Sequence, residues 1–119
     1  CVLCVETGAD LSALQNCLKA SEEMIASGDS SRYSDMNQSF HYEIWNASGN
    51  EKLVTMLSEL WNGLSMGVQT TEREYAKKSF AEHKKIYEAI AAKDAENARA
   101  QMEKHIRRSL EDMLTRYRE

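Results

Sequence analysis

Three histidines, His41, His83 and His105, are the residues of this chain whose type and spacing best suit chemistry. Each lies on the apolar face of a helix that the surrounding sequence predicts. An imidazole that is turned into a core needs a partner there, because an unpaired buried polar group costs free energy. Neutral imidazole is also the commonest protein ligand for zinc and similar ions. Three such side chains converging from three helices would therefore make a metal site.

Asn37 precedes His41 by four residues, so the two side chains share one face of a predicted helix, about 40° apart. The amide oxygen of Asn37 and a ring nitrogen of His41 can therefore reach one ion. Asp35 lies six residues from His41, on another side of the helix, and Glu82 lies one residue off the face of His83. The expected ligand set thus contains no carboxylate. Without that charge compensation we expect a lower affinity for the ion.

The alternative is three unrelated core histidines, each bonded to a backbone carbonyl or a hydroxyl group. That alternative is the usual one for a single buried histidine, whereas for three on buried faces the pattern supports the shared site and the alternative about equally. The sequence contains no nucleophile with its base, no paired carboxylates for acid–base catalysis and no glycine-rich phosphate loop. We therefore predict that the protein is not an enzyme.

Apolar residues recur at helical spacing along the whole chain. After a short apolar stretch at 1–5, helices are expected at about 10–28, 30–49, 50–67, 76–92 and from 94 onward. Asn50 and Asp94 suit the N-cap positions of the third and the last of these five helices. No segment shows the alternation that is typical of a strand. The predicted architecture is therefore all-α, an antiparallel helical bundle with short turns.

The composition is typical of one globular domain. The chain has 119 residues, of which 42% are hydrophobic and 29% charged, and it contains no proline to interrupt a helix. Its formal charge of −4 makes it a poor nucleic-acid binder by itself, because phosphate contacts need clustered lysine and arginine. No apolar run approaches the length of a membrane span, so we expect no membrane contact.

Three cysteines, Cys1, Cys4 and Cys17, leave an odd thiol. Cys1 and Cys4 have CxxC spacing, but a zinc ribbon needs a second pair. We expect them to pack as small hydrophobic residues and to remain free thiols, which fits a reducing cytoplasm. The chain also opens inside an apolar stretch without a start methionine or a helix cap, which indicates that its first helix is truncated.

Several short motifs, in their order along the chain, resemble those of the FCD domain. They are Phe40-His41, Ala47-Ser48-Gly49-Asn50, Leu60-Trp61, Glu82-His83-x-x-Ile86-x-x-Ala89-Ile90 and Asp94-x-x-x-Ala98-x-x-x-Met102-x-x-His105. FCD is the C-terminal, effector-binding domain of the FadR subfamily of GntR-type transcription regulators. The resemblance covers nearly the whole chain, and the motif order together with the 22-residue step from His83 to His105 makes it specific.

The resemblance implies that residues 1–119 form an effector-binding domain and that the DNA-binding winged helix-turn-helix of the family is absent from this chain. Many members hold a divalent metal through Asp-x-x-x-His and two later histidines, which match His41, His83 and His105. Asn37 takes the place of the aspartate, which is a departure from the pattern. The expected ion is zinc, with nickel, manganese or iron as alternatives. A small organic acid is expected to bind it by its carboxylate, although other members, FadR among them, lack the metal.

We therefore predict the ligand-sensing domain of a cytoplasmic, homodimeric, FadR-type regulator that reaches DNA only through the missing domain. The ligand pocket is expected to be lined by groups one helical turn from a metal ligand and by one residue of the third helix, namely Tyr33, Tyr87, Ser109 and Trp61. These four side chains would otherwise only fill the core. Two other functions stay open: a small helical-bundle metalloenzyme, which needs an acid–base group near the ion, and a metal-free helical interaction module.

Overall fold

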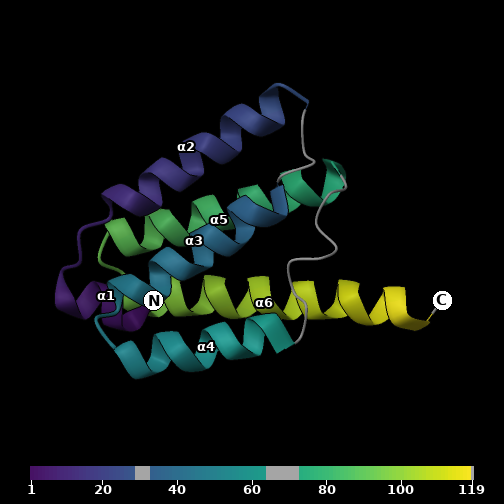
Figure 1. Ribbon diagram of the computed structural model, residues 1–119. Coiled ribbons are helices and arrows are strands. Elements are labelled where there is room, and N and C mark those ends of the chain that lie inside the picture. The colour runs from purple at the N-terminus through teal and green to yellow at the C-terminus, as the bar shows by residue number, and fades with distance from the viewer. Residues whose placement is uncertain (29–32, 64–72, 119) are drawn as a thin grey trace.

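The fold is built from α-helices throughout the part of the chain that the computed structural model describes, residues 1–28, 33–63 and 73–118 (Figure 1). The helices are α1 (Val2–Thr7), α2 (Ser12–Ala26), α3 (Tyr33–Ala47), α4 (Glu51–Gly63), α5 (Arg73–Ala91) and α6 (Ala95–Arg118). No strand occurs within these ranges. The prediction of an all-α bundle is confirmed.

Polar side chains fix the starts of α4 and α6 where the sequence predicted them. The side-chain oxygen of Asn50 accepts the backbone N–H of Leu53 at 3.1 Å. Asp94 does the same for the N–H of Asn97, also at 3.1 Å. Each bond satisfies an amide that the first helical turn leaves without a partner. Gly49 connects α3 to α4 with a φ of 74°, a left-handed conformation that glycine adopts without strain.

Other helix ends differ from the sequence-based boundaries by small amounts. Helix α5 begins at Arg73, three residues before the start of the predicted segment 76–92. Helix α3 begins at Tyr33, and the start predicted near Ser30 or Ser31 lies outside the described residues. The weakening expected near Gly67 also lies outside them. Boundary differences of a few residues are common where no capping side chain sets the end of a helix.

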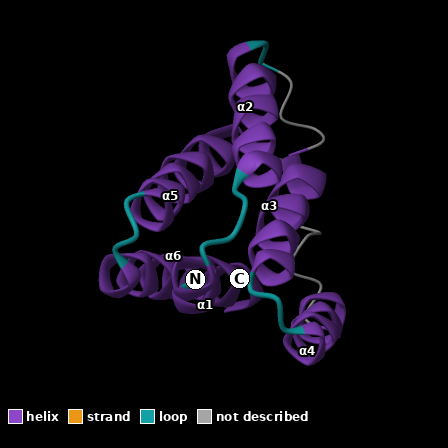
Figure 2. Ribbon diagram, turned by 90° about the vertical axis from the view of Figure 1, so that its left-hand side faces the viewer, coloured by secondary structure: helices purple, strands orange, loops and turns teal. Residues whose placement is uncertain are grey.

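Helix α5 contacts α1, α2, α3 and α6, and in Figure 2 it runs between α2 and the level of α6. Helices α2 and α3 pack along one side of it, and α6 runs along another (Figure 2). The backbone of α4 approaches only α3 among the described helices, so α4 lies at the edge of the bundle. None of the described helices combines the length and the apolar character needed to cross a membrane.

The hydrophobic core lies between α2, α3 and α5, with contributions from α1 and α6. Its buried members are Cys4, Leu14, Leu18, Phe40, Ile44, Ile86, Ala89, Ile90 and Ala98. Cys4 packs in this core as predicted, and its thiol donates to the backbone oxygen of Ile44 at 3.2 Å. All three cysteines are free thiols. The core holds α3, α5 and α6 in fixed relation, which is what a site built from these three helices requires.

Candidate metal centre

The three histidines come from α3, α5 and α6 and meet inside the bundle. The Nε2 atom of His105 lies 3.2 Å from Nε2 of His41 and 3.2 Å from Nε2 of His83. One ring nitrogen of each histidine lies within 4.8 Å of the other two, and all three residues are at most 2% exposed. Three buried imidazoles in this arrangement can hold a metal ion. The rings contact one another directly, so they are not three separate histidines in different parts of the core.

The spacing of the nitrogens suits a small ion. Two nitrogens that each lie about 2.0–2.1 Å from a tetrahedral zinc-like ion are roughly 3.3–3.4 Å apart. The two observed separations of 3.2 Å are close to that value. The nitrogens of His41 and His83 lie within 4.8 Å of each other, so the third separation has to shorten to the tetrahedral value only where it exceeds that value.

The protonation state of the rings also suits a metal. Burial lowers the pKa of His41 well below its ordinary value, and the neighbouring His105 adds to the effect. Burial likewise lowers the pKa of His83, with further contributions from His41, His105 and Arg108. Both imidazoles are therefore neutral near pH 7. Neutral imidazole is the form that binds metals, because a protonated nitrogen has no free electron pair.

Glu82 reaches the site from behind His105. Its Oε1 atom lies 2.7 Å from Nδ1 of His105, and Nε of Arg108 donates to both carboxylate oxygens at 2.8 and 2.7 Å. Burial by itself raises the pKa of Glu82, but the hydrogen bonds from His105 and Arg108 outweigh it, so the pKa is lowered. The anionic carboxylate thus accepts the proton on Nδ1. Nε2 of His105 keeps its electron pair toward His41 and His83, as in many carboxylate–histidine–metal arrangements.

The sequence-based expectation for Glu82 was incomplete. Glu82 is indeed one residue off the face of His83, but α6 lies beside α5 at that position, and the glutamate extends toward His105. One signal was available in the sequence: Arg108 lies three residues after His105, one helical turn along α6. A basic residue at this position can reach an acidic residue on a neighbouring helix, as Arg108 reaches Glu82 here.

The ring of His83 is held by three neighbours. Phe40 stacks on it, with 3.9 Å between ring centroids and an interplanar angle of 10°. The hydroxyl of Tyr33 lies 3.5 Å from Nδ1 of His83 and donates to Oγ of Ser79 at 2.8 Å. Ser79, one turn before His83 on α5, lies 3.4 Å from its Nε2 atom. Tyr33 therefore supports a histidine from behind, and the sequence did not single out Ser79 or Phe40 for such a role.

Asn37 lies one turn before His41 on α3 and is only 4% exposed. Its side-chain oxygen is buried and has no hydrogen-bond partner among the residues that the structure describes. A buried acceptor without a partner costs free energy, which a bound cation would recover. Asp35 is exposed and cannot serve instead. In chemical type, three imidazole nitrogens and one amide oxygen suit a divalent ion, and Asn37 stays a predicted ligand.

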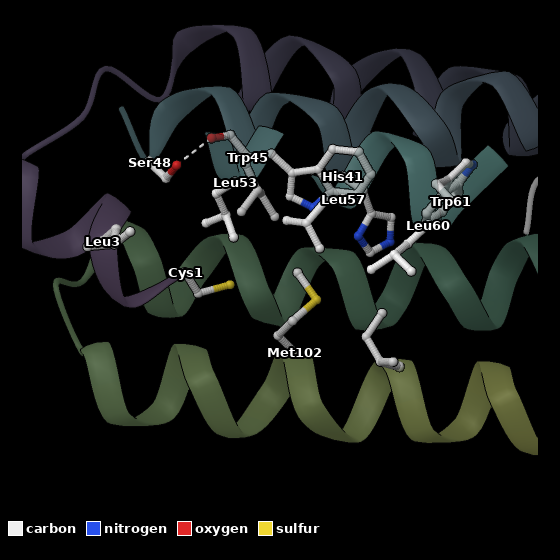
Figure 3. A pocket seen from close by; sticks show the side chains of 12 residues that line it. Cys1, Leu3, His41, Trp45, Ser48, Leu53, Leu57, Leu60, Trp61 and Met102 are labelled. Carbon is white, nitrogen blue, oxygen red and sulfur yellow. Dashed lines mark hydrogen bonds between the residues drawn. The ribbon is translucent and has the colours of Figure 1, made fainter. Parts of the chain in front are cut away.

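A cavity of about 330 Å³ adjoins His41 and lies between α1, α3, α4 and α6 (Figure 3). The described residues that line it are Cys1, Leu3, His41, Ile44, Trp45, Ser48, Leu53, Leu57, Leu60, Trp61, Met102 and Ile106. The ring centroid of Trp61 is 5.0 Å from that of His41 and 5.9 Å from that of Trp45. Two indoles and the leucines of α4 thus form the wall beside the histidine.

Of the four residues predicted to line a ligand pocket, only Trp61 belongs to this described lining. Tyr33 contacts His83 instead. Tyr87 is half-buried and packs against the hydrophobic core, and Ser109 is buried in α6. The positions along one helix do not reveal which side of that helix faces a cavity. For the same reason, the leucines of α4 were not predicted to line the pocket.

Comparison with known proteins gives one family and one curated relative. The sequence model of the FCD domain matches residues 3–108. The chain is 33% identical over 122 aligned residues to a Bacillus subtilis (strain 168) protein named HTH-type transcriptional regulator LutR. That alignment covers 93% of this chain but 52% of the relative, so the chain spans about half of the relative's length. No solved structure matches the chain. Because the family model covers most of the sequence, this chain belongs to the FCD domain family, as the order of its motifs predicted.

Proposed function

We propose that this chain is the ligand-sensing domain of a FadR-type transcription regulator and that it binds a small organic acid at a divalent metal centre. The observation that carries the proposal is the convergence of His41, His83 and His105 beside a cavity. The similarity to a transcriptional regulator twice as long supports a separate DNA-binding domain. In this proposal residues 1–119 form the effector domain, and the complete protein acts as a cytoplasmic homodimer.

The three histidines and the amide oxygen of Asn37 would hold the ion. Zinc suits three imidazoles and one oxygen, and nickel, manganese and iron are the alternatives. When bound, the ion would supply an uncompensated positive charge that attracts a carboxylate. None of the four donors is anionic, so the chain itself leaves that charge available to a ligand. The carboxylate of Glu82 would not bind the ion itself, because it contacts Nδ1 of His105 and is paired with Arg108.

Binding would favour one packing of the helices. His41 is on α3, and the cavity beside it is bounded by α4 and α6. A ligand that contacts all three helices stabilises the arrangement that encloses it, and only such differential affinity shifts a conformational equilibrium. Helix α4 is the element best placed to respond, because its backbone approaches α3 alone among the described helices.

The geometry favours binding over catalysis. The metalloenzyme alternative needs an acid–base group near the ion, and Glu82 is held behind His105 by Arg108. The described residues that line the cavity include no aspartate or glutamate. The interaction-module alternative assigns no role to the histidine cluster or to the cavity beside it. A sensor accounts for both features.

Metal analysis of the complete protein, purified without chelator, tests the proposal. We expect about one zinc-like ion per chain, and its removal should abolish stabilisation by carboxylates in a thermal-shift assay. The variant His41→Gln should lose the metal while circular dichroism shows the helices intact. A protein that binds no ion even after zinc is added would contradict the proposal. Turnover of an organic acid by the metal-loaded protein would support the enzyme alternative instead.

A further inference from the structure

The cavity beside His41 is apolar, and that property constrains what can bind there. Among the twelve described residues that line it, no side chain belongs to lysine, arginine, aspartate or glutamate. The hydroxyl of Ser48 already donates to the backbone oxygen of Trp45 (Figure 3). A ligand that enters this space therefore finds few polar partners apart from the imidazole of His41.

The cavity and the candidate metal centre share one residue, His41. His41 lines the cavity, and its Nε2 atom is also 3.2 Å from Nε2 of His105 in the centre. An acid held at the centre by its carboxylate would therefore extend its remaining atoms past His41. The space it enters is bounded by Trp45 and Trp61 on one side and by Met102 of α6 on another (Figure 3).

The α4 side of the cavity has apolar side chains that the protein itself leaves partly uncovered. Leu53 and Leu57 are half-buried, and Leu60 is 58% exposed. An apolar ligand would remove this surface from water, and each buried methylene group strengthens binding about fourfold. A volume of about 330 Å³ lies at the lower end of the range for small-molecule sites, roughly 300–1,000 Å³.

We infer that the acid sensed by this domain is a monocarboxylate with an apolar body, such as a medium alkyl chain or an aryl group. This inference rests on the proposed function and names its ligand class. A second carboxylate at the far end of such a ligand would enter the space between the indoles and the α4 leucines. No cationic side chain of the described lining would pair with it there. Burying an unpaired charge is costly, so di- and tricarboxylates should be rejected.

The sharpest test compares two acids of equal length on the complete, zinc-loaded protein by titration calorimetry. Octanoate and octanedioate share an eight-carbon chain and differ by one carboxylate. We expect octanoate to bind at least tenfold more tightly. From acetate to hexanoate, affinity should rise about fourfold per methylene until the cavity is filled.

Two variants of α4 provide the matched comparison. Leu57 lines the cavity, whereas Met56 is its neighbour in the sequence, is 60% exposed and is not among the described lining residues. Leu57→Asn should flatten the dependence of affinity on chain length. Met56→Asn should bind every acid as the unchanged protein does.

The outcomes separate the two proposals. If the zinc-loaded protein binds no carboxylate, the proposed function is wrong. If acetate, octanoate and octanedioate bind equally well, the metal anchors acids but the inferred ligand class is wrong. A Leu57→Asn variant that changes the oligomeric state in light scattering, with unchanged affinity for octanoate, would show that the cavity is an interface between copies. That result would also overturn the inference.

Discussion

Glu82→Gln perturbs the candidate metal centre without changing any of its four proposed ligands. Glutamine has nearly the same size as glutamate, and its amide oxygen can still accept the Nδ1 proton of His105. The substitution removes the negative charge that lies 2.7 Å from that nitrogen and one of the two oxygens that receive Arg108. The imidazole of His105 becomes a weaker electron donor and is held less firmly.

The expected magnitude follows from the same contacts. Loss of a hydrogen-bond partner behind a metal ligand typically lowers metal affinity about 10–100-fold. Two features place this variant near the lower limit. The glutamine retains one acceptor, and Arg108 already offsets much of the charge of Glu82, whose side chain is 22% exposed. We therefore expect about a tenfold loss of zinc affinity, which is about 1.4 kcal/mol.

Competition with a chromophoric chelator measures the zinc affinity of both proteins, and the visible spectrum of the cobalt-loaded forms reports whether the coordination geometry is kept. Glu103→Gln is the matched control. Glu103 lies on α6, the helix that carries His105, and pairs with two arginines, Arg99 and Arg107, but its side chain is 47% exposed. The control should bind zinc within about twofold of the unchanged protein. Equal losses in both variants, or none in Glu82→Gln, would refute the reasoning about His105.

Further predictions concern charge, pH and packing at the same site. Asn37→Asp should tighten zinc binding and weaken carboxylate binding, because the new charge compensates the ion; calorimetry that shows both to be tighter would mean that geometry at position 37 governs the site. For chelator-treated protein, the free energy of unfolding in urea should be nearly constant between about pH 7 and 8 and should fall below about pH 6.5, with a limiting slope of about 1.4 kcal/mol per pH unit for each of His41 and His83. The sign follows because burial lowers both pKa values in the folded state, so the unfolded chain takes up protons first; a flat profile down to pH 5 would contradict it. Phe40→Ala should cost about 3–5 kcal/mol of stability, since this 1% exposed ring packs in the core and stacks on His83; a loss below about 1 kcal/mol in urea unfolding would show that the stack contributes little.

The sequence predicted what depends on a single helix. Apolar spacing and two capping residues, Asn50 and Asp94, were enough to place the helices. The histidines could be assigned to buried faces because each face follows from the sequence around it. Their convergence required only that these faces turn toward one core, and a chain of this length forms a single core.

What depends on the relation between helices could not be predicted. Glu82 contacts His105 because α6 runs beside α5 at that level, and no pattern within α5 contains this information. Tyr87 and Ser109 were chosen for lying one turn from a histidine, yet the described cavity opens toward α4. The direction of that opening depends on where α4 packs against α3. The sequence of either helix alone does not reveal that position.

In the proposed function, the metal and the acid would stabilise different parts of the domain. His41, His83 and His105 join α3, α5 and α6, three helices that the hydrophobic core already holds together. An ion bound there would add stability to this fixed part, because anything that binds only the folded state stabilises it. The cavity, by contrast, is closed on one side by α4, whose leucines are partly exposed. In the proposed function the metal would therefore set the anchor point, and the apolar body of the acid would act on α4. Chain length, rather than the carboxylate alone, would then decide how strongly an acid changes the packing of the domain.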